Sequence, residues 1–175
     1  MHDSMIRTLS LVILLLAQSL CAQQGGLSAG FRASRILGSY PGRQFPSASY
    51  WVQTGKQIAS KFVGSTPAAV WIVGLYQDSD EIQLNFPSPG GTFPSIRFIS
   101  ADQNEEYLSK FDAEGIRVWL QIEPGPASVD TLIDLVLSRY KHHPCVAGFG
   151  VDVEWLDAKT NSGGRKLTDS AEVGR

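Results

Sequence analysis

The sequence predicts an α/β protein built on a parallel sheet of the TIM-type (β/α) barrel, of which this chain holds the N-terminal half. Short apolar runs typical of buried strands alternate with stretches of helical period. The strands end in charged or chain-breaking residues, as at the edge where a parallel sheet opens onto its loops. Four strand–helix units are half of a barrel, which takes about 250 residues in full. The alternative is a small open parallel sheet that is complete as it stands.

Three regions are expected along the chain: a signal peptide (1–22), an extended N-terminal segment (23–46) and the barrel domain (47–175), truncated at its C-terminus. In the first region, Arg7 precedes an apolar run that is short for a membrane span, and small residues then suit cleavage after Ala22. We therefore expect a secreted protein, extracellular or periplasmic, with no stable membrane insertion after cleavage. A lipoprotein or an uncleaved anchor is the less favoured alternative.

Composition narrows the function classes. The net charge of −2 gives no electrostatic reason to expect binding to nucleic acid or to anionic membranes. After cleavage Cys145 is the only cysteine, so no intramolecular disulfide can form. The pair His142-His143 is isolated in sequence and is interpreted as a helix end rather than as metal ligands. No metal and no organic cofactor is expected.

The elements of the barrel domain follow from apolar runs and capping residues. Gly and Pro mark the long loop at 77–95. In chain order we expect a helix from Ser47 or Ser49 to Gly64 with Trp51, Ile58 and Phe62 on its apolar face, a strand at 69–75, a short strand at 82–86, a strand at 96–99, a helix from Asp102 to Gly115, a strand at 116–122, a helix from Ser128 to Pro144, a strand at 146–155 and a helix start at 168–172.

The last strand, 146–155, carries the strongest functional signal. Side chains alternate along a strand, so Asp152 and Glu154 are predicted to share a face. Gly148 and Gly150 lie on the same face and are expected to leave space in front of the two acids. A strand with two glycines and two carboxylates on one face is a plausible floor for a polar pocket.

A third acid, Glu123, ends the preceding strand. Neighbouring strands lie about 4.8 Å apart and residues two apart along a strand lie about 6.6 Å apart. Carboxylates at these positions fall within the roughly 5–10 Å separation used in glycoside hydrolysis. That chemistry needs one protonated acid and one ionised partner. Glu154, Asp152 and Glu123 are therefore the candidate catalytic residues, although acids at strand ends also cap loops or form ion pairs.

Candidate substrate-binding residues lie beside these acids. Trp119 and Trp155 could stack on sugar rings, and Gln121 could hydrogen-bond a substrate hydroxyl. Each has a structural alternative: tryptophans are more often part of the core, and a buried amide can be satisfied within the protein.

The segment Ala147-Gly-Phe-Gly-Val-Asp-Val-Glu154 resembles the strand-four motif D-G-x-D-x-D-x-E of chitinase-type (family 18) glycoside hydrolases. Gly148, Asp152 and Glu154 match it, whereas Ala147 and Gly150 stand in place of its first two aspartates. The resemblance implies that Glu154 is the proton donor and that Asp152 helps to position the substrate or shares the proton.

These observations favour a secreted glycoside hydrolase that acts on a polysaccharide or oligosaccharide. Two other functions stay open. One is a non-catalytic carbohydrate-binding barrel that uses the same acids and tryptophans. The other is a metal-dependent hydrolase with Asp152 and Glu154 as oxygen ligands.

Overall fold

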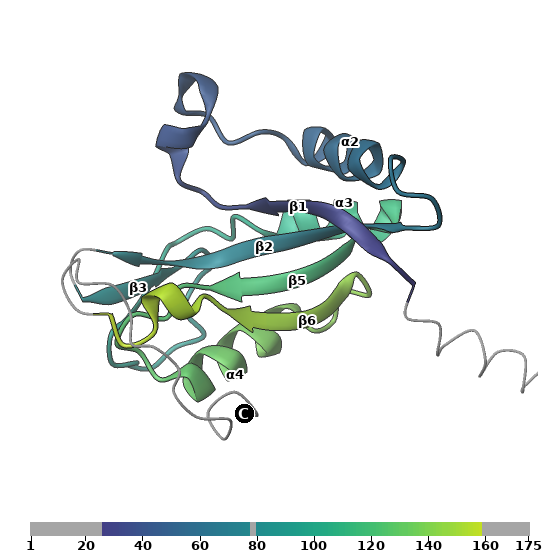
Figure 1. Cartoon of the computed structure of the whole chain (residues 1–175). Helices are drawn as coiled ribbons and strands as arrows, with labels where there is room; N and C mark the ends of the chain where they lie inside the picture. The colour runs from purple at the N-terminus through teal and green to yellow at the C-terminus, as the bar shows by residue number, and fades with distance from the viewer. Residues whose placement is uncertain (1–25, 78–79, 159–175) are drawn as a thin grey trace, which may run out of the picture.

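The computed structural model describes residues 26–77 and 80–158, which form a mixed α/β fold around one six-stranded sheet (Figure 1). The expected signal peptide and the helix start at 168–172 lie outside the described residues. The strands are β1 (Ser28–Ala33), β2 (Thr66–Gln77), β3 (Glu81–Leu84), β4 (Ile96–Phe98), β5 (Arg117–Ile122) and β6 (Val146–Val151). The helices are α2 (Ala48–Ala59), α3 (Glu105–Glu114) and α4 (Val129–Tyr140), with short 3-10 turns at Leu37–Ser39, Pro41–Arg43 and Val153–Trp155.

Four neighbouring strands form one parallel block of the sheet, and β3 and β4 form a separate parallel pair. β1, β2, β5 and β6 are hydrogen-bonded neighbours in the order in which they occur along the chain, and all pairs among them are parallel. A helix separates each strand from the next: α2 after β1, α3 before β5, and α4 before β6. The predicted α/β class with a mostly parallel sheet is therefore confirmed, but the sheet is not closed into a barrel.

The strands β3 and β4 depart from the purely parallel sheet expected from the sequence, because β3 runs antiparallel to β2. β3 pairs antiparallel with the second half of β2, from Gly74 opposite Leu84 to Gln77 opposite Glu81. The connection between these strands is only a few residues long, and so short a link joins antiparallel strands, because a parallel return needs a crossover of a dozen residues or more. β3 thus follows β1 along the same edge of β2, whose first half pairs with β1.

β1 lies in the segment 23–46, which the sequence predicts to be extended but not part of the barrel domain. The strand consists mainly of small residues, so it shows no apolar run. Its one large apolar side chain, Phe31, stacks on Trp51 of α2 with ring centroids 4.7 Å apart. This contact and the full ladder with β2 place β1 in the sheet, so the domain starts before residue 47.

The core lies on one face of the sheet. Val118, Leu120 and Ile122 of β5 are fully buried there, together with Leu108 of α3 and Leu132 of α4. All three described α-helices pack against this face. In Figure 1, α3 lies behind the strands, while α2 is seen above β1 and α4 below β6. The other face carries the side chains of alternate residues, which are partly exposed.

The helix ends follow the capping chemistry read from the sequence. The Ser47 hydroxyl accepts a hydrogen bond from the amide of Tyr50, and the Ser128 hydroxyl accepts one from Thr131. Gly115 ends α3 in the left-handed conformation, with φ of 69°. The prediction for α2 was too long: the helix ends at Ala59, and Phe62 lies beyond it, half exposed.

The predicted strand 146–155 is also too long. β6 ends at Val151, and Val153–Trp155 form a 3-10 turn whose N-cap is Asp152. The Asp152 carboxylate accepts a hydrogen bond from the amide of Glu154, so the short side chain competes with the strand ladder for this backbone. Strand alternation therefore does not place Asp152 and Glu154 on a common face.

None of the helices in the two described ranges combines the length and the apolar character needed to cross a bilayer.

Candidate functional site

The candidate site lies where β2, β5 and β6 end next to one another. The amide of Asp152, just after β6, donates to the carbonyl of Ile122 at 2.8 Å. The amide of Glu123, just after β5, donates to the carbonyl of Gly74 in β2 at 3.1 Å. Backbone pairing thus brings together two acids that are 29 positions apart, as the sequence predicts for neighbouring parallel strands.

Glu123 is the buried carboxyl of the site, with 8 % of its surface exposed. Its Oε2 accepts a hydrogen bond from the backbone amide of Tyr76 at 3.2 Å. Burial raises the pKa of Glu123 to about 7, and the charges of Asp152 and Glu154 act in the same direction. The Tyr76 hydrogen bond and the charge of Arg32 oppose this shift without cancelling it. Glu123 is therefore about half protonated near neutral pH.

Arg32 holds the second acid. Its Nη2 lies 2.7 Å from Oδ2 of Asp152, and its Nε donates to Oε1 of Gln121 at 2.7 Å. The planar guanidinium thus links the end of β1 to β5 and to the residue after β6. The side-chain oxygen of Gln121, a residue expected to bind substrate, therefore accepts a hydrogen bond within the protein.

Arg32 was not among the residues singled out from the sequence. It lies in a segment of small residues without strand periodicity, so its position in a sheet is not evident from that segment alone. The available signal was its spacing from Phe31: an arginine beside the one large apolar residue indicates that the two side chains point to opposite faces of an extended segment.

Glu154 lies in the 3-10 turn, and its side chain is exposed. It contributes to the electrostatics of the site, because its charge raises the pKa of Glu123. The structure therefore groups Glu123, Asp152 and Glu154, but through a turn rather than through a shared strand face.

The tryptophans occupy different positions. Trp155 packs against Tyr76 with ring centroids 5.6 Å apart, directly beside the backbone that Glu123 holds. Trp119 lies on the helix-free face of β5, where the guanidinium of Arg117 lies 5.3 Å from its ring centre. Neither side chain is fully buried, so both tryptophans have surface available for contact.

The two glycines of β6 have different roles. A Cβ atom at Gly148 would lie 2.9 Å from the indole of Trp119, so this glycine makes room for that side chain. The expectation that it leaves space in front of the acids is wrong for this reason. At Gly150 the nearest atom would be a backbone oxygen 3.9 Å away, so the expected space is present there.

The acids of this site are poorly arranged for a metal. Both oxygens of Asp152 are already engaged, Oδ2 by Arg32 and Oδ1 by the amide of Glu154. In the described part of the chain, the His, Cys, Asp and Glu side chains close enough to share an ion lie on the helix-covered side of the sheet instead. The hollow between α2 and α3, lined by Gln53, Lys56 and Lys110 among others, has none of these acids in its lining.

Comparison with protein-family models, with curated proteins and with solved structures gave no match. The resemblance to family 18 glycoside hydrolases therefore stays a prediction that rests on Gly148, Asp152 and Glu154.

Proposed function

We propose that the carboxyl-terminal edge of this sheet is an acid–base site for the hydrolysis of glycosidic bonds. The observation that carries the proposal is the environment of Glu123: a buried carboxyl with a pKa of about 7 beside an aspartate that is paired with arginine. Two carboxyl groups with different environments are the arrangement that glycoside hydrolysis requires.

In this proposal Glu123 is the proton donor. Its raised pKa keeps a large fraction protonated at neutral pH, so the carboxyl can deliver a proton to the oxygen of the leaving sugar. Asp152 supplies the negative charge that stabilises the oxocarbenium-like transition state, and Arg32 fixes the orientation of its carboxylate. This exchanges the roles suggested by the family 18 resemblance, in which Glu154 is the donor, because Glu123 is buried and Glu154 is exposed.

We further propose that the sheet belongs to a (β/α) barrel. Two features support this: the four parallel strands are neighbours in chain order, and their connecting helices all cover one face. A doubly wound sheet has helices on both faces, whereas a barrel has them only outside. The acids then lie at the edge where barrel enzymes carry their active sites.

The test is hydrolysis of a panel of 4-nitrophenyl glycosides and polysaccharides by the full chain and its isosteric variants. E123Q and D152N are expected to lower turnover by at least 100-fold, because each removes one of the two carboxyl functions. D130N, which alters an exposed acid on α4, is the control and retains activity. Activity of the parent chain should fall as the pH rises above about 7, the pKa of the proton donor.

Three results would refute the assignment. Hydrolysis that E123Q leaves unchanged removes Glu123 as the donor. Loss of turnover in E154Q, with E123Q active, assigns the proton to Glu154 as the sequence resemblance implies. Absence of turnover across the panel removes the hydrolase function altogether.

A non-catalytic carbohydrate-binding function is the second candidate. The aromatic pair of Tyr76 and Trp155 beside the acids favours it, because stacked rings next to hydrogen-bonding carboxylates are suited to holding a sugar. Saturable oligosaccharide binding without turnover, weakened in W155A, supports this candidate over the hydrolase.

A further inference from the structure

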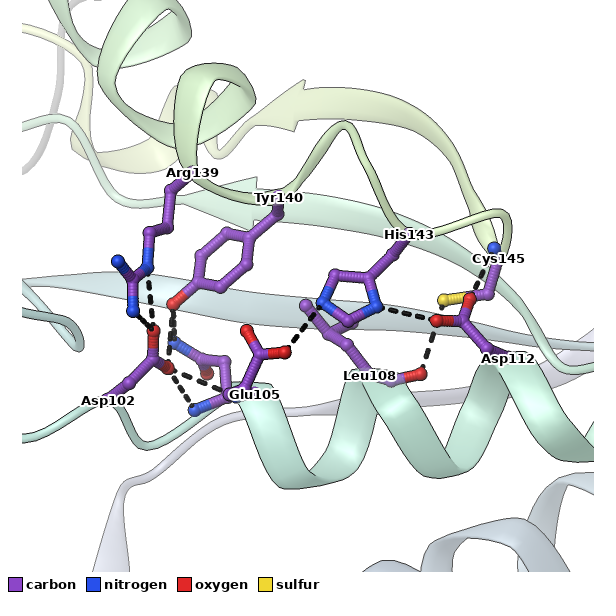
Figure 2. Close-up of polar contacts among 9 residues, drawn as sticks. Asp102, Glu105, Leu108, Asp112, Arg139, Tyr140, His143 and Cys145 are labelled. Atoms are coloured by element: carbon purple, nitrogen blue, oxygen red, sulfur yellow. Dashed lines mark hydrogen bonds and ion pairs between the residues drawn. The ribbon is translucent and has the colours of Figure 1, made fainter.

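A second cluster of ionisable side chains lies on the helix-covered side of the sheet, between α3 and the loop that follows α4 (Figure 2). His143 is at its centre and is 95 % buried. Its Nδ1 lies 2.6 Å from Oδ2 of Asp112, and its Nε2 lies 3.3 Å from Oε1 of Glu105. Glu105 and Asp112 are seven residues apart on α3 and so lie on the same side of that helix.

The Nε2 atom of His143 is buried and has no hydrogen-bond partner. The Glu105 oxygen is near it, but not along the direction in which an N–H bond would donate. A buried imidazole nitrogen left without a partner is destabilising, because it has lost its hydrogen bonds to water. A buried nitrogen without a hydrogen-bond partner, this close to a carboxylate oxygen, points to a third participant between them.

His142 completes the cluster. Its ring lies 4.2 Å from the ring of His143, and one ligand atom from each of Glu105, His142 and His143 lies within 4.8 Å of the others. We propose that these three residues bind a divalent transition metal ion, with zinc as the best match. Imidazole nitrogen with one carboxylate oxygen is a donor set that suits Zn²⁺ better than Ca²⁺ or Mg²⁺.

The distances fit this ion. Zinc binds His nitrogen and carboxylate oxygen at about 2.0–2.1 Å, which in a tetrahedron places two ligand atoms about 3.3–3.4 Å apart. The Glu105 oxygen and the His143 nitrogen are 3.3 Å apart. His142 is exposed, so its side chain can adjust toward the same centre. Three protein ligands leave one tetrahedral position for water.

Asp112 prepares His143 for this role. Its Oδ2 lies 2.6 Å from Nδ1 of His143, and its Oδ1 accepts a hydrogen bond from the backbone amide of Cys145 at 2.7 Å. In this position the carboxylate can accept the proton of Nδ1 and leave the lone pair of Nε2 for the metal. A carboxylate behind a ligating histidine commonly fixes the tautomer and orientation of the ring in this way.

A neighbouring network of hydrogen bonds holds α3 and α4 in a fixed relative position. Oδ2 of Asp102 accepts a hydrogen bond from Nε of Arg139 at 2.9 Å, and Oδ1 accepts one from the Tyr140 hydroxyl at 2.9 Å (Figure 2). These contacts join the start of α3 to the end of α4. They fix the distance between Glu105 and the histidine pair before an ion binds, which is the support that a metal site needs.

The alternative to a metal site is a metal-free ion pair of His143 with Glu105 and Asp112. Titration with zinc distinguishes these two hypotheses. The full chain, first dialysed against a chelator, is titrated with ZnCl₂ by calorimetry and by thermal unfolding. We expect one equivalent of Zn²⁺ to bind and to raise the Tm, because the ion binds the folded state. H142A changes an exposed ligand and E105Q a half-exposed one, and each should weaken binding by at least tenfold.

One control accompanies these variants. E106Q changes the exposed neighbour of Glu105 on the same helix and should bind zinc with the affinity of the parent chain. Cobalt substitution adds a spectroscopic readout: the visible absorption of four-coordinate Co²⁺ should appear in the parent and disappear in H142A. Absence of saturable zinc binding, or equal affinity in H142A and the parent, would overturn the proposal.

Discussion

Replacing Glu123 by glutamine should change how the stability of the protein depends on pH. The amide keeps an oxygen that accepts the Tyr76 hydrogen bond, so the geometry of the site is preserved while its titration is removed. The comparison of the parent chain with E123Q therefore isolates one carboxyl group, because every other ionisable residue is common to both proteins.

The magnitude follows from the shift in pKa. Folding raises the pKa of Glu123 from 4.5 to about 7, so the folded state binds this proton more tightly than the unfolded state does. The stability contribution is thus greatest below pH 4.5 and is lost as the pH rises through about 7. A shift of this size corresponds to about 3 kcal/mol at most, and solvent near the site reduces it to about 2 kcal/mol.

Urea unfolding followed by tryptophan fluorescence at several pH values measures this difference. The free energy of unfolding of the parent, minus that of E123Q, should fall by about 2 kcal/mol between pH 4 and pH 8. E106Q, which removes an exposed glutamate, should show no comparable trend relative to the parent. A parent-minus-E123Q difference that stays constant over this range would refute the argument that burial perturbs Glu123.

Two further substitutions test the packing that positions the site. N104A should lower the free energy of unfolding by about 2–4 kcal/mol, because the buried amide accepts a hydrogen bond from the Trp71 indole and donates to two oxygens. In the same urea assay the control Q103A, at an exposed neighbouring residue, should change the free energy of unfolding by no more than about 0.5 kcal/mol. G30A should lower the free energy of unfolding by about 3 kcal/mol, because its Cβ would lie 1.6 Å from a backbone oxygen of β2. G38A is the control, since a Cβ atom at that position meets no other atom within 4 Å. Equal effects of the two substitutions would contradict the β1–β2 pairing.

The parts of the fold that could be predicted from the sequence are those with strong local signals. The apolar run of β2 and the serine caps at Ser47 and Ser128 were recognised because each depends only on residues nearby in the chain. β1 was not recognised as part of the sheet, because Gly30 and its small neighbours carry no strand pattern. Its place is decided by pairing with a strand more than 30 residues away.

The same distinction applies to the candidate site. The proximity of Glu123 and Asp152 could be predicted from strand order, since adjacent parallel strands end at the same edge. The difference in environment between these two acids could not be predicted, because the burial of Glu123 depends on the end of β2 and on the turn after Asp152. The turn itself was missed because an aspartate at a strand end and an aspartate at a helix cap look alike in sequence.

The division of one edge of β2 between β1 and β3 bears on local unfolding. The backbone of the first half of β2 is protected from solvent by β1 on that edge, and the backbone of the second half by β3. Departure of β1 from the sheet therefore leaves the second half of β2, and with it the backbone amide that holds Glu123, in place. The same opening withdraws the Arg32 guanidinium from Asp152, so the electrostatic field at the two acids depends on the docking of the first strand of the fold.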